Sequence, residues 1–223
     1  MLKIQDIAGG IRCIGLDRAA KRNAIGVEMT LALEEVLAET AHDERVHVVV
    51  FHGIGGHFSA GMDMKDFFDA SVRPANELRR ARAATEHWRT RLLSDLPQTL
   101  ISAVQGYCFG GALPILAWSD VVLAGADTRF GLPEINFGFV PGGQVIKALG
   151  TVMARRALAY AALTGRPFDA QQGKRCGLVT EVVDGDPLPQ ALALAGKLVA
   201  SGAASGTYAQ GRCNHPAPKE STP

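Results

Sequence analysis

The segment GYCFGGALPIL (residues 106–116) carries two adjacent glycines inside an otherwise apolar run. The preceding residues QTLISAVQG (98–106) are largely apolar, as in a strand that is buried on both faces. Glycines at the end of such a strand permit a tight turn and let the backbone approach a ligand closely. Pro114 then falls in the first turn of the next helix, where N–H groups have no intrahelical partner. The segment therefore predicts a strand, a glycine turn and a helix.

The same alternation of strands and helices continues on both sides of this segment. VHVVVFHG (46–53) is a second buried strand, and shorter strands are expected over 10–17, after a hairpin turn at Gly9 and Gly10, and over 177–185. Residues 119–143 predict a strand, a turn and a loop. Apolar residues at helical spacing predict helices over 27–41, 65–68, 81–96, 144–163 and 187–202. Such alternation predicts βαβ crossovers and a largely parallel sheet, hence an α/β fold.

The composition is that of a globular protein. Of 223 residues, 47% are hydrophobic and 20% are charged, which permits a sizeable core. The net charge of +1 shows no basic excess, so we expect no nucleic-acid partner. No run approaches the ~18 apolar residues of a membrane span, and the N-terminus is too mixed in polarity for a signal peptide. We therefore expect a soluble, cytoplasmic protein without a membrane partner.

Two further features concern the cysteines and the C-terminal segment. The cysteines Cys13, Cys108, Cys176 and Cys213 lack CxxC spacing, which favours free thiols over a zinc site or a disulfide framework. Beyond Ser201 the residues are small, polar and proline-containing. We therefore predict a core domain over 1–200 and a disordered tail over 201–223, with no metal site.

Two glycine turns are positioned to bind a ligand. SAGMD (59–63) follows the strand at 46–53, and CFGGAL (108–113) follows the strand at 98–106. Ligands of open α/β sheets bind beyond the carboxyl ends of the strands. Side by side, the two turns would direct two backbone N–H groups at one oxygen, as an oxyanion hole does in acyl chemistry. The alternative is that each turn only connects a strand to a helix.

Some side chains also suggest chemistry. Glu134 lies among Leu132, Pro133 and Ile135, and a carboxylate in apolar surroundings is a plausible general acid or base, unless it points to solvent. Lys21 and Arg22 suit a phosphate-bearing ligand, or form a solvated basic loop. His57 lies beside the first turn and could line a site, although a plain loop histidine fits as well. Ser59 lacks the GxSxG pattern of serine hydrolases, and no Walker or dinucleotide-binding motif is present.

Five separated segments resemble one family in order and spacing. They are LDRAAKRNAI (16–25), HFSAGMDMKDFF (57–68), AVQGYCFGGAL (103–113), SDVVLAGADTRFGLPEINFGFVPGG (119–143) and ALTGRPFDAQQGKRCGLVTEVV (162–183). Over about residues 10–200 the chain is similar to the crotonase, or enoyl-CoA hydratase/isomerase, superfamily. The resemblance implies a spiral of ββα units, a homotrimer or hexamer, and an acyl-CoA substrate. No cofactor is implied other than the coenzyme A of that substrate.

The resemblance also implies roles for individual residues. The N–H groups of Met62 and Gly111 would bind the thioester oxygen, and Glu134 would move the proton. The residues expected to bind the CoA ester are Lys21, Arg22, Ala24, Ala60, Asp63, Met64, Gly110, Pro133, Phe137 and Gly142.

The chain departs from the family pattern at two places. Typical hydratases have a second glutamate three residues after the oxyanion glycine, where this chain has Pro114, so we expect chemistry with one glutamate, as in enoyl-CoA isomerases. The pattern also stops near Ser201, and we expect a shortened or frame-altered C-terminal helical part. AGMDMKDFF, QGYCFGG and EINFGFVPGG resemble hydroxycinnamoyl-CoA (feruloyl-CoA) hydratase/lyases, which produce an aromatic aldehyde and acetyl-CoA. A non-catalytic subunit that binds CoA esters is a further alternative.

Overall fold

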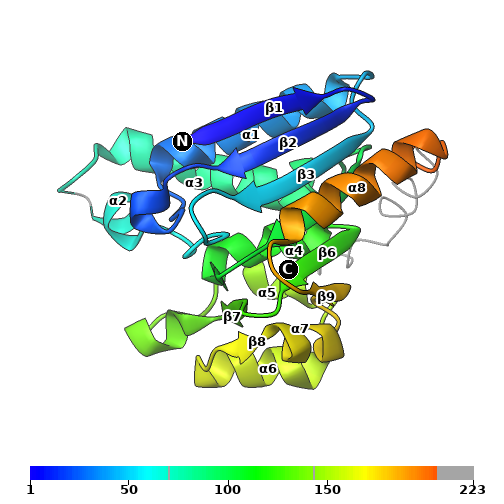
Figure 1. Ribbon diagram of the computed structural model, residues 1–223. Coiled ribbons are helices and arrows are strands. Elements are labelled where there is room, and N and C mark those ends of the chain that lie inside the picture. Colours follow the sequence, from blue (N-terminus) through cyan, green and yellow to red (C-terminus); the bar gives the residue numbers. More distant parts are fainter. Residues whose placement is uncertain (70, 143, 205–223) are drawn as a thin grey trace, which may run out of the picture.

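A six-stranded sheet forms the centre of the molecule (Figure 1). The computed structural model describes residues 1–69, 71–142 and 144–204. The strand order is β1 (Leu2–Ile7), β2 (Ile11–Leu16), β3 (Val48–Gly53), β4 (Thr99–Val104), β6 (Val121–Gly125) and β9 (Glu181–Val183). Strands β2 to β9 pair in parallel, and β1 pairs antiparallel with β2 through the hairpin at Gly9 and Gly10. The predicted α/β fold with a largely parallel sheet is confirmed.

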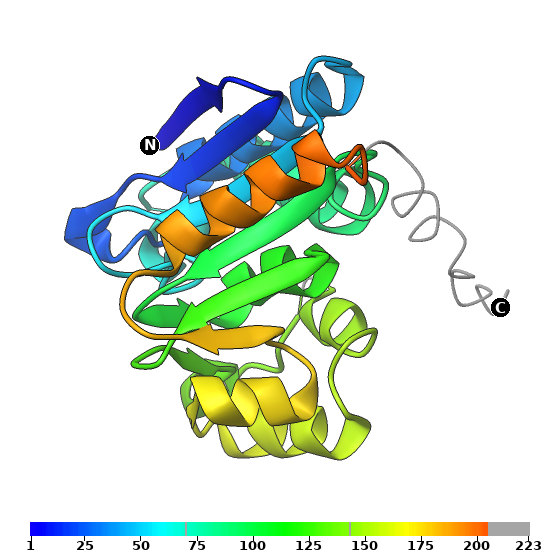
Figure 2. The same ribbon diagram turned by 45° about the vertical axis from the view of Figure 1, so that its right-hand side comes forward.

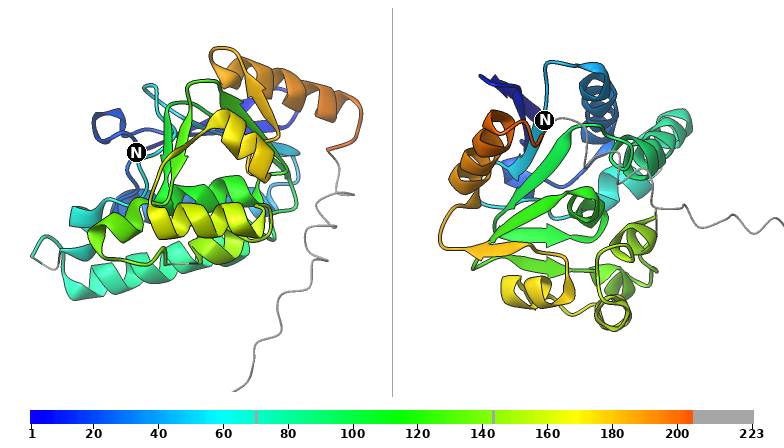
Figure 3. Two further views of the ribbon diagram at one scale, coloured as in Figure 1. Left: turned by 90° about the horizontal axis from the view of Figure 1, so that it is seen from below. Right: turned by 90° about the vertical axis from the view of Figure 1, so that its right-hand side faces the viewer.

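The sheet is buried on both faces, which explains the continuous apolar runs of its strands. Val49 and Phe51 of β3 belong to the larger core cluster, together with residues of α1 (Val27–His42). Val48 and Val50 alternate with them and pack in a second cluster with residues of α8 (Pro187–Ala200). The helices α8 and α1 lie on opposite faces of the sheet (Figures 2 and 3).

A smaller sheet and several short helices lie beside the six-stranded sheet. The smaller sheet has the order β5 (Tyr107–Phe109), β7 (Arg129–Gly131) and β8 (Phe168–Asp169). Short 3-10 helices cover Ala19–Lys21 (η1), Gly110–Ala112 (η3) and Pro133–Phe137 (η4). The further α-helices are α2 (Met64–Phe68), α3 (Ala75–His87), α4 (Leu113–Trp118), α5 (Val145–Leu149), α6 (Arg155–Thr164) and α7 (Ala170–Cys176). Pro114 lies in the first turn of α4, as predicted.

Two predicted helices differ from the structure. The helix expected over 144–163 is two helices, α5 and α6, because the chain breaks between them, where the Ala154 N–H donates to the Cys176 carbonyl at 2.9 Å. The helix expected over 81–96 begins at Ala75, directly after Pro74, and passes into the π-helical turn η2 (Trp88–Leu92). The disordered tail is predicted from residue 201, but residues 201–204 form a turn after α8, and Ala204 is buried in the second core cluster. The rest of the predicted tail, from residue 205 onward, lies outside the described residues.

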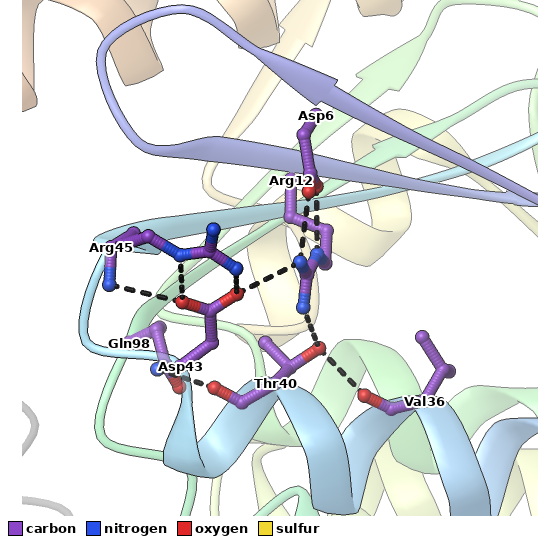
Figure 4. Close-up of polar contacts among 7 residues, drawn as sticks. All are labelled: Asp6, Arg12, Val36, Thr40, Asp43, Arg45 and Gln98. Carbon is purple, nitrogen blue, oxygen red and sulfur yellow. Dashed lines mark hydrogen bonds and ion pairs between the residues drawn. The ribbon is translucent and has the colours of Figure 1, made fainter.

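A polar network ties the β1–β2 hairpin to the end of α1 (Figure 4). The Arg12 side chain, 10% exposed, donates from Nε and Nη2 to the Asp6 carboxylate at 2.7 and 2.9 Å. The guanidinium also donates to Asp43 Oδ2 and to Thr40 Oγ1, both at 3.1 Å. The hydrogen bond from Arg12 lowers the pKa of Asp6 and raises that of Arg12. One guanidinium therefore joins a strand hairpin to a helix end.

We expect Arg12→Met to lower the free energy of unfolding by about 1–3 kcal/mol. The substitution removes the buried guanidinium that donates to Thr40 Oγ1 and to Asp43 Oδ2. Urea denaturation of both proteins measures the difference. Arg45→Met is the matched control, since Arg45 also pairs with Asp43 but its side chain is 88% exposed. Equal losses in the two variants would contradict a structural role for Arg12.

Candidate active site

A cavity of about 750 Å³ lies where the two glycine turns meet α2, α3 and η4. Most of the residues predicted for the site line it: Ala60, Met62, Met64, Gly110, Gly111, Pro133, Glu134, Phe137 and Gly142. The wall is largely aromatic and apolar, with Phe67, Phe68, Phe109 and Phe139 added to these residues. Such a wall, with few polar groups, is typical of a small-molecule site.

The two glycine turns are in direct contact. The Ser59 N–H donates to the Tyr107 carbonyl at 2.8 Å, and the Phe109 N–H donates to the Ser59 carbonyl at 3.0 Å. Gly61 has φ +91°, and a Cβ there would lie 2.7 Å from the Phe109 oxygen and 3.5 Å from the Gly111 nitrogen. Glycine at position 61 therefore lets the backbone of the first turn approach that of the second.

The N–H groups of Met62 and Gly111 are directed by the pairing around them. Ile25 donates to the Gly61 carbonyl at 2.8 Å and accepts from the Asp63 N–H at 2.9 Å. In such a parallel bridge the residue between the two partners, Met62, points its own N–H the other way. Gly111 lies in the first turn of η3, where N–H groups have no intrahelical acceptor. Both residues line the cavity, so the arrangement can present two donors to one ligand oxygen.

Glu134 lies against the second turn. A Cβ at Gly110, which has φ +48°, would lie 2.6 Å from Glu134 Oε1. Glu134 Oε2 is buried and has no hydrogen-bond partner among the described residues. Burial raises the pKa of Glu134, while its backbone hydrogen bond and the Arg89 charge act in the opposite direction. A carboxylate with a raised pKa beside two backbone donors is suited to proton transfer.

Lys21, Arg22, Ala24 and Asp63 do not line the cavity. Asp63 caps α2 by accepting from the Asp66 N–H at 3.2 Å, and it pairs with Arg18 at 2.7 Å, so its contacts are structural. The loop of Lys21 and Arg22 contacts the first turn, because the Ala60 N–H donates to the Arg22 carbonyl at 2.8 Å.

His57 and Ser59 hold the turns together. The Ser59 hydroxyl donates to the Asn23 carbonyl at 2.7 Å and accepts from the Gly61 N–H at 3.1 Å. The His57 ring stacks on Tyr107 with centroids 4.6 Å apart, and its Nδ1 accepts from the Tyr107 N–H at 3.2 Å. Neither residue lines the cavity, so the contacts that both make within the turns are structural.

Within residues 1–69, 71–142 and 144–204, no group of three or more His, Cys, Asp or Glu side chains is placed to hold a metal ion. In the same part of the chain, no helix has the length and apolar character needed to cross a bilayer.

Arg89 is a cavity residue that the sequence did not single out. It lies in the π-helical turn η2 and is 4% exposed. Its Nη2 donates to the Gly111 carbonyl at 2.6 Å and to Met62 Sδ at 2.9 Å. Burial lowers its pKa to about 10, so the guanidinium stays charged at neutral pH. Thr85, four residues before it, is buried as well, but both residues are polar, so the spacing of apolar residues gives no signal for this position.

The comparisons with known proteins point to one family. The family model described as "Enoyl-CoA hydratase/isomerase" matches residues 6–221, which extends past Ser201, where the sequence pattern was expected to end. A hydroxycinnamoyl-CoA hydratase-lyase of Pseudomonas fluorescens is 33% identical over 83% of this chain and 66% of its own length. A 2,3-dehydroadipyl-CoA hydratase of Escherichia coli K12 is 34% identical over 82% of this chain and 70% of its own length.

Solved structures show the same fold. The crystal structure of an enoyl-CoA hydratase from Mycobacterium smegmatis has a TM-score of 0.84 and 26% identity, covering 95% of this chain and 80% of that one. An enoyl-CoA hydratase/isomerase from Mycobacterium paratuberculosis has a TM-score of 0.86, covering 95% and 84%, and at 21% identity it supports the fold alone. The chain spans about two thirds of the length of the first curated relatives, 66% and 64%. By the family match and these relatives, the chain belongs to the enoyl-CoA hydratase/isomerase family and has the crotonase fold.

Proposed function

We propose that the chain is an enzyme that acts on an enoyl-CoA thioester through two backbone donors and one glutamate. The N–H groups of Met62 and Gly111 bind the thioester oxygen, where negative charge develops as an enolate forms. The observation that supports this most is the Glu134 carboxylate, which lies against Gly110 in the same cavity wall.

One carboxylate can serve both proton transfers. In hydration, Glu134 takes a proton from water as the water oxygen bonds to the β-carbon, and then returns the proton to the α-carbon of the enolate. In isomerisation it takes the proton from the α-carbon of a 3-enoyl thioester and returns it at the γ-carbon. Pro114 occupies the position of the second glutamate in typical hydratases, is buried in α4, and does not line the cavity. We therefore assign the proton transfers to Glu134.

A lyase acting on an aromatic enoyl-CoA is the second candidate. The cavity wall includes Phe67, Phe68, Phe109, Phe137 and Phe139, side chains that can pack against an aryl group. A relative named hydroxycinnamoyl-CoA hydratase-lyase also supports it. In this reaction the β-hydroxyl of the hydrated adduct gives its proton to Glu134, and the Cα–Cβ bond breaks to leave an aldehyde and the enolate of acetyl-CoA. Glu134 then returns the proton to the enolate carbon, which yields acetyl-CoA. With either reaction, Lys21 and Arg22 would lie along the phosphates of the CoA ester. Assembly of the chain as a trimer or hexamer stays a prediction.

Incubation with crotonyl-CoA, a 3-enoyl-CoA and feruloyl-CoA distinguishes the candidates. We expect turnover of at least one thioester. The reaction is monitored as a loss, a gain or a shift of enoyl-thioester absorbance, and the product is identified by its mass. A hydroxyacyl-CoA indicates hydration, an unchanged mass with a moved double bond indicates isomerisation, and acetyl-CoA with an aldehyde indicates the lyase. Binding of the thioesters without any turnover would instead favour a non-catalytic subunit.

A further inference from the structure

A single guanidinium contacts both glycine turns. Arg89 Nη2 donates to Met62 Sδ in the first turn and to the Gly111 carbonyl in the second, at 2.9 and 2.6 Å. Arg89 itself comes from a third element, η2, whose backbone is fixed by the Trp118 Nε1–H donating to the Arg89 carbonyl at 2.8 Å. The two residues proposed as donors are therefore held by one side chain from outside their own turns.

The space around Arg89 is closely filled. A Cβ at Gly111 would overlap Arg89 Nη2 and would lie 2.7 Å from Met62 Cγ. The guanidinium also lies over the Trp88 ring, with its carbon 4.9 Å from the ring centroid. A residue packed this tightly limits how far the two turns can move relative to each other.

Within the described part of the chain, Arg89 makes no ion pair with a carboxylate, unlike most buried cations. Among the described ion pairs none includes Arg89, and its buried Nε has no hydrogen-bond partner in the described part of the chain. Burying a charge without a close partner is unfavourable, so stability alone is a poor reason for an arginine at this position. Its field acts on Glu134, which shares the cavity wall.

We propose that Arg89 is a positioning residue of this active site, which sets the spacing of the Met62 and Gly111 N–H groups and supplies a positive charge to the cavity wall that it shares with Glu134. The inference rests on the proposed function, because it assigns Arg89 a role in the same chemistry. Among the described residues, Arg82 and Glu86 are the other charged groups that line the cavity, and Arg155 and Arg156 lie on α6, the helix that contacts η4. Of these charges, that of Arg89 acts to lower the pKa of Glu134.

The charge and the geometry can be separated by two substitutions. Arg89→Met removes both, so we expect kcat to fall by about 10–30-fold while KM changes by less than about twofold. It should also move the acidic limb of the pH profile of kcat/KM to higher pH, because Glu134 must be ionised to accept a proton and the Arg89 charge lowers its pKa. Arg89→Lys keeps the charge without the planar fork, so we expect a smaller loss of kcat and an unmoved limb.

Arg91→Met is the matched control, since Arg91 is exposed in the same helical turn, and it should retain wild-type kinetics. A direct titration of Glu134 by NMR of ¹³C-labelled glutamate, identified by the signal lost in Glu134→Gln, gives a second readout. An unmoved Glu134 titration in Arg89→Met would overturn the charge role. Wild-type kcat in both Arg89 variants would overturn the positioning role.

The two proposals can fail separately. If the wild-type protein turns over no thioester, the proposed function fails, and the NMR titration still decides whether Arg89 controls Glu134. If Arg89→Met does not fold, as circular dichroism would show, Arg89→Lys decides the positioning role through kcat. In that case the NMR titration of a second charge-removing variant, Arg89→Gln, decides the charge role.

Discussion

Replacing Glu134 with glutamine should lower kcat by about 10³-fold or more, while the affinity for a CoA ester changes by less than about twofold. Glutamine has the shape of glutamate but can neither accept nor return a proton at neutral pH. The thioester oxygen would still meet the N–H groups of Met62 and Gly111, which are backbone donors and are not altered. Steady-state kinetics with the accepted thioester, and calorimetry with a non-reactive CoA ester, measure the two quantities.

The fold should survive this change. Glu134 Oε2 is buried without a partner, so a neutral amide at this position removes the cost of burying a charge. Glu35→Gln, at an exposed position of α1, is a matched control that should leave kcat and affinity unchanged. A Glu134→Gln enzyme with wild-type kcat would show that another group moves the proton, and Glu86, the other carboxylate of the cavity wall, would be tested next.

The strands and turns could be predicted because their signals are local. The runs at 46–53 and 98–106 are apolar at consecutive positions since β3 and β4 are covered on both faces. The break between α5 and α6 could not be predicted, because it depends on a hydrogen bond from Ala154 to Cys176, which is distant in sequence. Periodicity shows which face of a helix is buried, but not where a distant partner interrupts it.

The residues that line the cavity were also predicted only in part, because some of their signals are local and others are not. Glu134 could be found because its sequence neighbours are apolar, and the glycine turns because each follows a strand. Arg89 could not, since its role depends on Met62 and Gly111, which lie 27 and 22 positions away. Asp63 adjoins the first turn in sequence, yet its carboxylate is used by α2 and Arg18. Local sequence patterns therefore predicted where the two turns are, but they did not predict which side chains surround the turns in the structure.

The spacing of the two turns should be as important as the glutamate, and Gly61→Ala tests it. The added Cβ would lie 2.7 Å from the Phe109 oxygen, and because that atom belongs to the backbone, the turns must separate by several tenths of an ångström. We expect kcat/KM to fall by about 10²-fold, since both donors must reach one oxygen at hydrogen-bond distance. Steady-state kinetics measure the loss, and urea denaturation should show a lower free energy of unfolding.

Gly56→Ala separates backbone strain from the spacing of the turns. Gly56 has φ +89°, nearly that of Gly61, but a Cβ there would meet nothing within 4 Å. The control therefore carries the cost of a left-handed alanine, about 1–3 kcal/mol, without pushing one turn from the other. We expect Gly56→Ala to lose stability and keep its activity. If both variants lost activity equally, strain in the loop would explain the effect. If Gly61→Ala alone lost activity, the contact between the turns would be what places the Met62 N–H beside that of Gly111.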